Sequence, residues 1–231
     1  MAFVFGIIMH QNIVIVSGGR LGNMDFFRTQ VAKIENRLII CCDSGARHLA
    51  AAALIPDVLV GDMDSIGSSR LADYVRKGVK IIQHPADKDF TDTALALDYA
   101  VGLHPERIHI WGALGGRMDH ALANLFLLLK GKEAGIKICL LDEFCEAFIA
   151  DNDVTFAGVT GCLVSLLALS PRVEGVTLQG FLYPLDEGTL SLSESRGISN
   201  IIQAEQAHIC VRSGNLLVIR YRQKDVFPEA N

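Results

Sequence analysis

The sequence predicts an α/β protein in which an N-terminal Rossmann-like domain with a parallel sheet is followed by a small all-β sandwich domain. Two observations carry this prediction. Up to Leu141, short continuous apolar runs alternate with longer amphipathic segments, as a parallel sheet covered by helices on both faces requires. Beyond Leu141 the runs become shorter and richer in Val, Leu, Thr and Ser, and turn residues recur about every ten residues, which is typical of antiparallel strands.

In the first domain, each apolar run bounded by turn residues is expected to be a strand. The predicted strands are Asn12–Ser17, Arg37–Cys42, Val58–Gly61, Val79–Ile82, Arg107–Trp111 and Ile136–Leu141. Helical periodicity fills the segments between them. The predicted helices are Met24–Ile34, Ala46–Ala53, Ser68–Lys77, Asp92–Val101 and Asp119–Glu133.

In the second domain, clusters of Gly, Asn, Asp and Pro predict turns between short strands. The expected turns are Ala150–Asp153, Ala157–Gly161, Ser170–Gly175, Tyr183–Gly188 and Arg212–Asn215. The change of texture places the domain boundary near Asp142–Ala150, so we expect domains of residues 1–145 and 146–231.

Composition excludes several classes of protein. The chain has 231 residues, of which 50% are hydrophobic and 20% charged, so it can bury a large core and is neither disordered nor fibrous. It contains no unbroken apolar run of the roughly 18 residues that a membrane-spanning helix needs. The net charge of −5 offers no basic field for a nucleic acid.

Cysteine usage and the N-terminus bear on where the protein works. The 6 cysteines form no CxxC pair and no zinc-like spacing, so we expect reduced core cysteines in a cytoplasmic protein. Residues 1–8 are apolar but lack a basic flank and a small-residue cleavage site. They are therefore expected to be an upstream extension rather than a signal peptide.

Acidic residues follow the predicted strands of the first domain. The carboxyl ends of parallel strands meet at one edge of the sheet, so these side chains are expected to converge on one crevice. Two carboxylates about 5 Å apart repel by about 3 kcal/mol at an effective dielectric constant of about 20, so a cation is needed to hold several together. Oxygen ligands favour magnesium, manganese or calcium, whereas the alternative is that single residues such as Asp92 cap helices. The acidic residues are Asp43, Asp62, Asp64, Asp89, Asp92 and Asp119.

Glycine and basic residues complement these acids. Gly18-Gly19 follows the first predicted strand, and Gly115-Gly116 follows the fifth, so the backbone can approach a ligand closely at both places. Each pair can equally be an ordinary turn. Arg117 and Lys88 are candidates for phosphate contact, although Lys88 can also be a solvated surface lysine.

Four segments occur in an order that resembles the motif series of the thiamine pyrophosphokinase family. The most specific are Gly61-Asp62-Met63-Asp64-Ser65 and Lys88-Asp89-Phe90-Thr91-Asp92, flanked by Asp43-Ser44-Gly45-Ala46 and Gly115-Gly116-Arg117-Met118-Asp119-His120. The segment Gly197-Ile198-Ser199-Asn200 is similar to a late Ser-Asn motif of the same family. The chain departs from the pattern at Ser44, where many relatives carry glycine, and in having no tryptophan near Ser199.

The resemblance implies a magnesium-dependent transfer of the terminal pyrophosphate of ATP to the hydroxyl of thiamine, with release of AMP. It implies metal ligands, nucleotide contacts and substrate contacts, with thiamine residues supplied by the other subunit of a homodimer. The implied metal ligands are Asp43, Asp62, Asp64 and Asp92; the nucleotide contacts are Lys88, Thr91, Gly116 and Arg117; the substrate contacts are Asp119, Ser199 and Asn200; and the catalytic residues are Asp64, Asp92, Arg117 and Asp119. His120 is expected to make structural hydrogen bonds at the start of a helix.

Two alternative functions remain open. The same first domain could serve a pyrophosphokinase that acts on another alcohol, such as a pterin, and Ser199-Asn200 argues for thiamine instead. A non-catalytic protein that binds thiamine or nucleotide is the other alternative. The complete set of acidic motifs argues against it, because clustered carboxylates without a task are costly.

Overall fold

The computed structural model describes residues 11–87 and 89–222, and within them it contains two compact units. The first unit holds the described residues up to Asn124 together with Ala134–Lys137. The second holds Leu125–Glu133 and the described residues from Ile138 onward. The expected boundary at 145/146, which rests on the change in sequence texture, stays a prediction.

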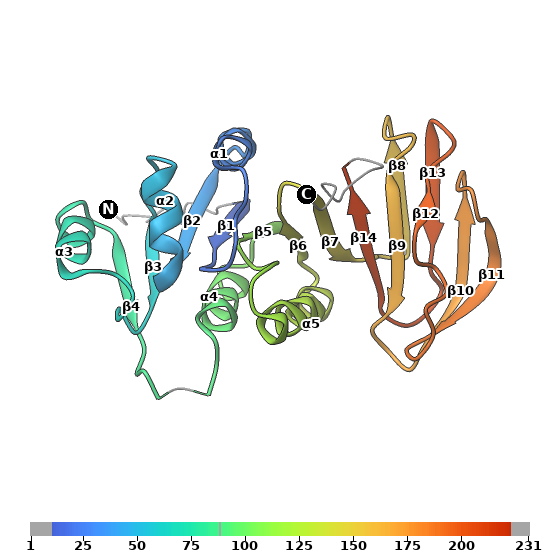
Figure 1. The fold of residues 1–231 in the computed structure, drawn as a ribbon. Coiled ribbons are helices and arrows are strands. Elements are labelled where there is room, and N and C mark those ends of the chain that lie inside the picture. Colours follow the sequence, from blue (N-terminus) through green and yellow to red (C-terminus); the bar gives the residue numbers. More distant parts are fainter. Residues whose placement is uncertain (1–10, 88, 223–231) are drawn as a thin grey trace, which may run out of the picture. The chain divides into compact units, whose positions relative to one another are not determined.

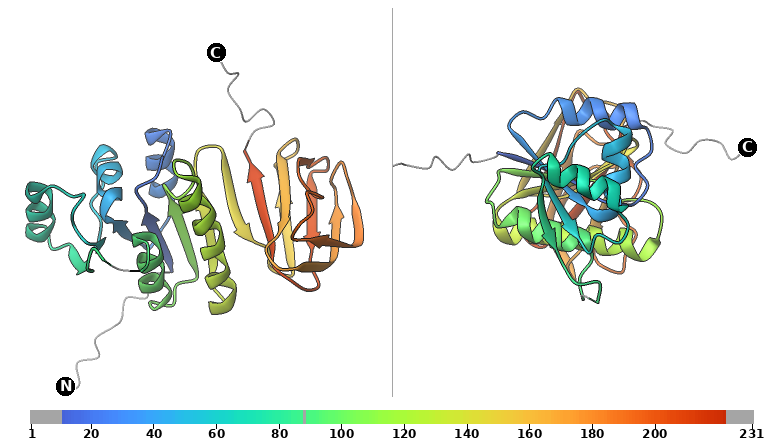
Figure 2. Two further views of the ribbon diagram at one scale, coloured as in Figure 1. Left: turned by 60° about the horizontal axis from the view of Figure 1, so that its bottom comes forward. Right: turned by 90° about the vertical axis from the view of Figure 1, so that its left-hand side faces the viewer.

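The first unit is built on a parallel sheet with the strand order β5-β1-β2-β3-β4 (Figure 1). Helices α1 and α2 lie on one face of this sheet and α4 lies on the other (Figures 1 and 2). The strands are β1 (Asn12–Val16), β2 (Arg37–Cys42), β3 (Val58–Gly61), β4 (Lys80–Gln83) and β5 (Arg107–Trp111). The helices are α1 (Met24–Ala32), α2 (Ala46–Ala51), α3 (Ser68–Arg76), α4 (Asp92–Val101) and α5 (Met118–Ala134), the last of which runs into the second unit.

The strand order creates a switch point. From β1 the chain adds β2, β3 and β4 on one side, and α4 then carries it back to place β5 on the other side of β1. The loops that follow β1 and β5 therefore part in opposite directions. In open α/β sheets the crevice at this position is where ligands bind.

Burial explains why the central strands β1, β2 and β3 are largely apolar. Val14, Ile15, Ile40 and Val60 are fully buried, because helices cover both faces of the sheet. Two helix starts are fixed by capping. Asn23 accepts a hydrogen bond from Phe26 N at the start of α1, and Thr91 accepts one from Ala94 N at the start of α4.

The second unit is a β-sandwich. Its strands form two antiparallel layers, one with the order β12-β9-β14-β7-β6 and the other a four-stranded sheet with the order β11-β10-β13-β8. Side chains from both sheets, including Leu166, Val173 and Ile209, share one core. The strands are β6 (Lys137–Leu141), β7 (Cys145–Ile149), β8 (Asp153–Ala157), β9 (Leu163–Ala168), β10 (Arg172–Gln179), β11 (Leu185–Ser191), β12 (Asn200–Ile201), β13 (Gln206–Cys210) and β14 (Leu216–Tyr221).

The predicted α/β fold followed by a β-sandwich is confirmed. Two of the expected turns are wrong in part, because β10 already begins at Arg172 and β11 at Leu185. The glycine that suggested the first turn, Gly175, has φ +64° at a place where the β10–β11 register shifts. It marks a β-bulge inside the strand rather than the end of a turn.

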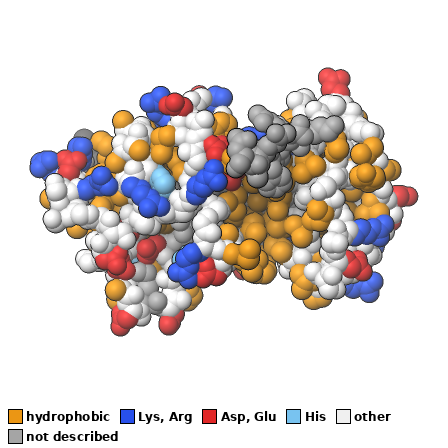
Figure 3. Space-filling model, viewed as in Figure 1, with side chains coloured by type: hydrophobic (Ala, Val, Ile, Leu, Met, Phe, Trp, Pro, Cys, Tyr) orange, Lys and Arg blue, Asp and Glu red, His pale blue; other side chains and the backbone are white. Residues whose placement is uncertain are grey.

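The surface charges and the hydropathy of the helices are as the amino-acid composition predicts. On the face seen in Figure 3, basic and acidic side chains are interspersed over the first unit, in keeping with the net charge of −5. Within residues 11–87 and 89–222, no helix combines the length and hydropathy needed to cross a membrane.

Candidate active site

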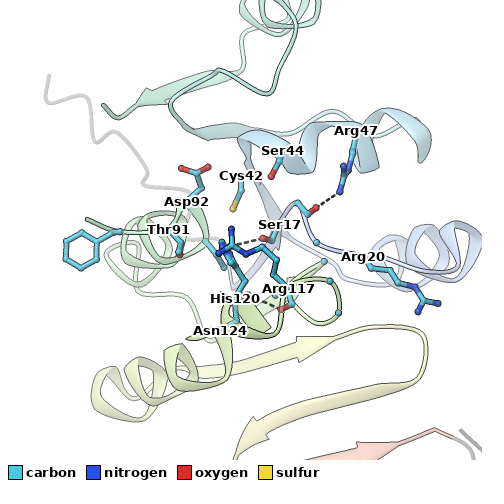
Figure 4. A pocket seen from close by; sticks show the side chains of 18 of the residues that line it. Ser17, Arg20, Cys42, Ser44, Arg47, Thr91, Asp92, Arg117, His120 and Asn124 are labelled. Atoms are coloured by element: carbon cyan, nitrogen blue, oxygen red, sulfur yellow. Dashed lines mark hydrogen bonds between the residues drawn. The ribbon is translucent and has the colours of Figure 1, made fainter. Parts of the chain in front are cut away.

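A cavity of about 540 Å³ lies at the switch point of the first unit (Figure 4). The loops after β1 and β5 line it on two sides, and the start of α4 and the helix α5 complete its wall. Its position is the one that the topology predicts for a ligand. The lining residues include Ser17, Gly18, Gly19, Ser44, Arg47, Thr91, Asp92, Gly112, Gly116, Arg117, His120 and Asn124.

Two glycine turns form part of this cavity and pack against each other through their backbones. Gly19 N donates a hydrogen bond to Gly112 O over 2.8 Å. A Cβ atom at Gly19 would lie 2.4 Å from Gly112 O, and one at Gly112 would lie 2.5 Å from Ser17 O. Gly112 also has φ +67°, which other residues rarely adopt. Glycine is therefore required at both positions by close packing, and at Gly112 by backbone conformation as well.

Helix α2 holds the first glycine turn in place. Arg47 donates a hydrogen bond to the carbonyl of Gly18 (Figure 4), and the ring Nε2 of His48 lies 2.8 Å from Gly19 O. A bond to a carbonyl requires the proton on this nitrogen. Burial lowers the pKa of His48, so the ring is neutral near pH 7 and donates from Nε2.

A buried pair of hydroxyl groups forms the cavity wall next to α4. Ser17 Oγ and Thr93 Oγ1 are 2.7 Å apart, and Cys42 lies beside them. Burial, reinforced by the negative charge of Asp92, raises the pKa of the Cys42 thiol to about 12. Cys42 is therefore a neutral thiol at pH 7 and not a nucleophile.

Three carboxylates form an acidic cluster, which we define as Asp43, Asp62 and Asp64. One oxygen from each lies within 4.8 Å of the others, a spacing that one cation can bridge. Asp43 is only 1% exposed, and Ser65 N donates to its Oδ2 over 2.9 Å. Its Oδ1 is buried and has no hydrogen-bond partner in the described part of the chain. Burial and the neighbouring carboxylates raise the pKa of Asp43.

These features fit a divalent metal. An orphaned, buried carboxylate oxygen beside two further acids is costly unless a cation takes up the charge. The donors are all oxygen, which suits a hard ion such as magnesium. Local hydrogen bonds fix the other two members, since Asp64 N donates to Asp62 Oδ1 and Ser65 Oγ donates to Asp64 Oδ1.

Asp92 lies next to this cluster and also lines the cavity. A Cβ atom at Gly61 would be 2.7 Å from Asp43 Cβ and 3.4 Å from Asp92 Cγ, so both acids pack against the same glycine. The alternative role of Asp92 as a helix cap does not hold, because Thr91 caps α4. Asp92 thus stands between the acidic cluster and the cavity.

Arg117 and Asp119 pair with each other. Arg117 Nε donates to Asp119 Oδ1 over 3.1 Å, and Nη2 donates to Oδ2 over 2.5 Å. Hydrogen bonding to Arg117 lowers the pKa of Asp119 to about 2. Both side chains are exposed, at 74% and 63%. His120 N also donates to Asp119 Oδ1, so this carboxylate organises the start of α5.

The remaining residues predicted for the first domain have different outcomes. Thr91 and Gly116 line the cavity, and Gly116 has φ +90°. Lys88 lies outside the described residues. The hydrogen bond of His120 at the helix start comes from its backbone N, so the structural role expected of the histidine side chain stays a prediction; the residue also lines the cavity.

Ser199 and Asn200 lie in the second unit beside a smaller cavity of about 260 Å³. Asn200 is 3% exposed, and its amide bonds both Tyr183 N and Tyr183 O, over 3.0 and 2.8 Å. Ser199 has φ +60°, and its N donates to Ser165 Oγ. Asn200 therefore fixes the backbone of Tyr183, a residue that is 63% exposed and lines the cavity.

Several cavity residues were missed by sequence reasoning, among them Arg47 and Asn124. Arg47 directly follows the Asp43-Ser44-Gly45-Ala46 motif in the sequence and lies in α2, but nothing in its spacing distinguishes it from a surface arginine. Asn124 had a signal: it is a polar residue inside the apolar run Ala121–Leu129, and it is buried.

Comparison with known proteins gives a consistent result. The family model described as "Thiamin pyrophosphokinase, catalytic domain" matches residues 30–140, and "Thiamin pyrophosphokinase, vitamin B1 binding domain" matches residues 152–216. Thiamine pyrophosphokinase of Bacillus subtilis (strain 168) is 33% identical over 188 residues, which cover 80% of this chain and 88% of that protein.

Solved structures agree with these matches. The crystal structure of thiamine pyrophosphokinase from Bacillus subtilis has a TM-score of 0.80 at 30% identity, covering 91% of this chain and 98% of that one. A thiamin pyrophosphokinase family protein from Enterococcus faecalis has a TM-score of 0.77 at 29% identity, covering 91% and 98%. The acidic cluster, the cavity at the switch point and the β-sandwich thus occur in a chain that belongs to the thiamine pyrophosphokinase family.

Proposed function

We propose that this chain transfers the terminal pyrophosphate group of ATP to the hydroxyl of thiamine, giving thiamine diphosphate and AMP, with magnesium as the metal. One observation carries the proposal beyond family membership. The acidic cluster stands beside a cavity that is lined by glycine turns and arginines at the switch point of the sheet. This combination suits a metal-bound triphosphate.

The reaction is a displacement at phosphorus. The hydroxyl oxygen of thiamine forms a bond to the β-phosphorus, and the bond from this phosphorus to the oxygen bridging to the α-phosphate breaks. AMP leaves with the electron pair, and the hydroxyl proton passes to water. Little covalent work falls to the protein, so positioning and charge neutralisation are its main contributions.

The side chains of the first unit would divide this work. A magnesium ion held by Asp43, Asp62, Asp64 and the adjacent Asp92 would neutralise charge on the triphosphate. Arg117 would donate to phosphate oxygens, with Asp119 holding its guanidinium in the required direction.

The backbone and small side chains of the cavity wall would complete the phosphate site. Thr91 and Gly116 border the same space, so the Thr91 hydroxyl and the Gly116 backbone would contact the transferred group. Lys88 is proposed as a further phosphate contact on the strength of its motif.

Thiamine recognition is proposed to lie in the second unit. The smaller cavity is bordered by Tyr183, Ile198 and Leu185, and an aromatic ring with apolar neighbours suits a planar heterocycle. Asn200 would contribute to thiamine binding by fixing the backbone of Tyr183. Ser199 precedes Asn200 directly and would contribute through its position beside the same cavity. Tyr183 would thereby supply the stacking ring that the absence of a nearby tryptophan left unassigned.

Assembly and location are proposals of the same kind. We infer a homodimer in which the second unit of one subunit serves the first unit of the other. The 6 cysteines are all free thiols, as is usual in a reducing compartment, and we propose that the protein works in the cytoplasm.

A product assay tests the proposed function. The purified chain is incubated with ATP, magnesium and thiamine, and the nucleotide products are separated. AMP in equal amount to thiamine diphosphate is expected, whereas ADP would indicate transfer of a single phosphoryl group. A parallel reaction with a hydroxymethylpterin in place of thiamine should yield no AMP. AMP formation with the pterin alone would favour the alternative alcohol.

A further inference from the structure

Asn124 is a buried residue at the cavity wall, and its side-chain acceptor makes no hydrogen bond within the described part of the fold. Among residues 11–87 and 89–222, six polar or charged residues are buried: Ser17, Asp43, Thr93, Asn124, Ser165 and Asn200. Asp43 belongs to the proposed metal site, and the side chains of Ser17, Thr93, Ser165 and Asn200 form hydrogen bonds with other protein groups. Asn124 is 5% exposed, and its Oδ1 accepts no hydrogen bond from any residue that the structure describes.

The other end of the amide explains how this oxygen is held. Asn124 Nδ2 donates to Ala113 O over 2.9 Å in a buried hydrogen bond. Ala113 belongs to the turn after β5, which also borders the cavity. The bond therefore sets the orientation of the amide, and Oδ1 is the group left for the cavity that Asn124 lines (Figure 4).

The chemistry of the ligand limits what this oxygen can bind. An amide oxygen accepts and cannot donate, and phosphate oxygens near neutral pH are also acceptors. Asn124 Oδ1 therefore cannot form a hydrogen bond with the triphosphate oxygens, whereas the arginines can donate hydrogen bonds to them. Once a ligand fills the cavity and shields this oxygen from water, leaving it unpaired would cost about 1–3 kcal/mol, so a ligand with a donor at this point is favoured over one without.

We propose that Asn124 Oδ1 accepts a hydrogen bond from a donor at the nucleoside end of ATP, either a ribose hydroxyl or the exocyclic amine of the base. Asn124 is then a specificity residue for the nucleotide, separate from the acidic cluster. The inference rests on the proposed function, because it takes ATP as the ligand of this cavity.

Nucleotide analogues test the proposal and separate the two sources of the donor. The ratio kcat/KM is measured at saturating thiamine with ATP, 2′-deoxy-ATP, 3′-deoxy-ATP and purine riboside triphosphate, which lacks the amine. For the unaltered enzyme we expect a loss of about tenfold with the analogue that lacks the bonded donor, as one lost hydrogen bond implies. Equal use of all four nucleotides would overturn the proposal, and this result needs no variant.

The substitution N124L then assigns the effect. The variant should use ATP less efficiently, and the analogue that lacks the donor should cause no further loss, because the acceptor is gone. The KM for thiamine should not change. Full analogue discrimination in N124L, or a loss confined to the KM for thiamine, would overturn the proposal.

A matched control removes the same type of bond elsewhere. Asn12 Nδ2 donates to Glu35 O over 3.0 Å outside the cavity. N12L should leave analogue discrimination as it is in the unaltered enzyme. If the unaltered chain forms no AMP from ATP and thiamine, the proposed function fails, whereas activity without discrimination refutes only the role of Asn124.

Discussion

Replacing Asp43 by Asn removes one charge from the acidic cluster and keeps the side-chain shape, including the acceptor for Ser65 N. At the 4.8 Å limit between cluster oxygens, two charges repel by about 3.5 kcal/mol at an effective dielectric constant of about 20. Water screens this repulsion, because Asp62 is half-buried and Asp64 is exposed. We therefore expect D43N to stabilise the metal-free protein by about 1–2 kcal/mol.

The assay is thermal unfolding with and without magnesium. A gain of about 1–2 kcal/mol corresponds to about 2–8 °C in Tm for a protein of this size. With magnesium and ATP the order should reverse, because the unaltered protein gains about 2.7 kcal/mol when ligand is at about a hundred times its Kd, and D43N gains less. D186N, which removes an exposed carboxylate on β11, should shift neither curve.

The sign of the pH dependence follows from the pKa of Asp43, which is raised above its ordinary value of 3.8 in the folded protein. A raised folded pKa gives stability that is fully present below the unfolded value and is lost as pH rises through the folded one. The metal-free advantage of D43N should therefore be largest near pH 7 and shrink towards acid pH. A D43N protein that melts lower without metal, and still gains as much from magnesium, would refute the metal site.

Three further predictions concern activity and assembly. D64N should lower kcat by about a hundredfold or more without lowering Tm, as expected for lost transition-state electrostatics, and near-normal activity would remove Asp64 from the mechanism. D119N should lower kcat by about tenfold, because Arg117 loses the carboxylate that orients it. Both side chains are exposed, so Tm should not change, and a lower Tm with unchanged kcat would contradict this role. If subunits share sites, mixing inactive D64N with a Y183A variant under subunit exchange should restore roughly a quarter of normal activity, because about half the dimers are mixed and each of these has one intact site. No recovery, with exchange verified by differently tagged chains, would show that each site is built within one chain.

The first domain could be predicted closely because its central strands are buried on both faces. Their apolar runs end where the sheet ends, and the expected strand Arg37–Cys42 has the observed bounds. The second domain was harder to predict. Gly175 and Gly188 indicate turns in sequence, and only the pairing of β10 with β11 shows that they lie within strands.

Sequence reasoning could predict the site residues that follow directly after a strand. It could not predict which side chains form hydrogen bonds with each other. The convergence of Asp43, Asp62 and Asp64 follows from topology, and the structure brings them together. The pairing of Arg117 with Asp119 and the burial of Asn200 against Tyr183 depend on local loop geometry. No periodicity in the sequence encodes such contacts.

The interlocked glycine turns have a consequence for inhibition and resistance. Gly19 and Gly112 contact each other through main-chain atoms, and a side chain at either would collide with a carbonyl at 2.4 or 2.5 Å. Main-chain donors and acceptors at this part of the cavity are the same whatever side chains surround them. An inhibitor that forms its hydrogen bonds with the main chain of these two turns would contact groups that no tolerated point substitution removes. An inhibitor that depends on the side chain of Arg47 or Arg117 would lose its contact through a single substitution.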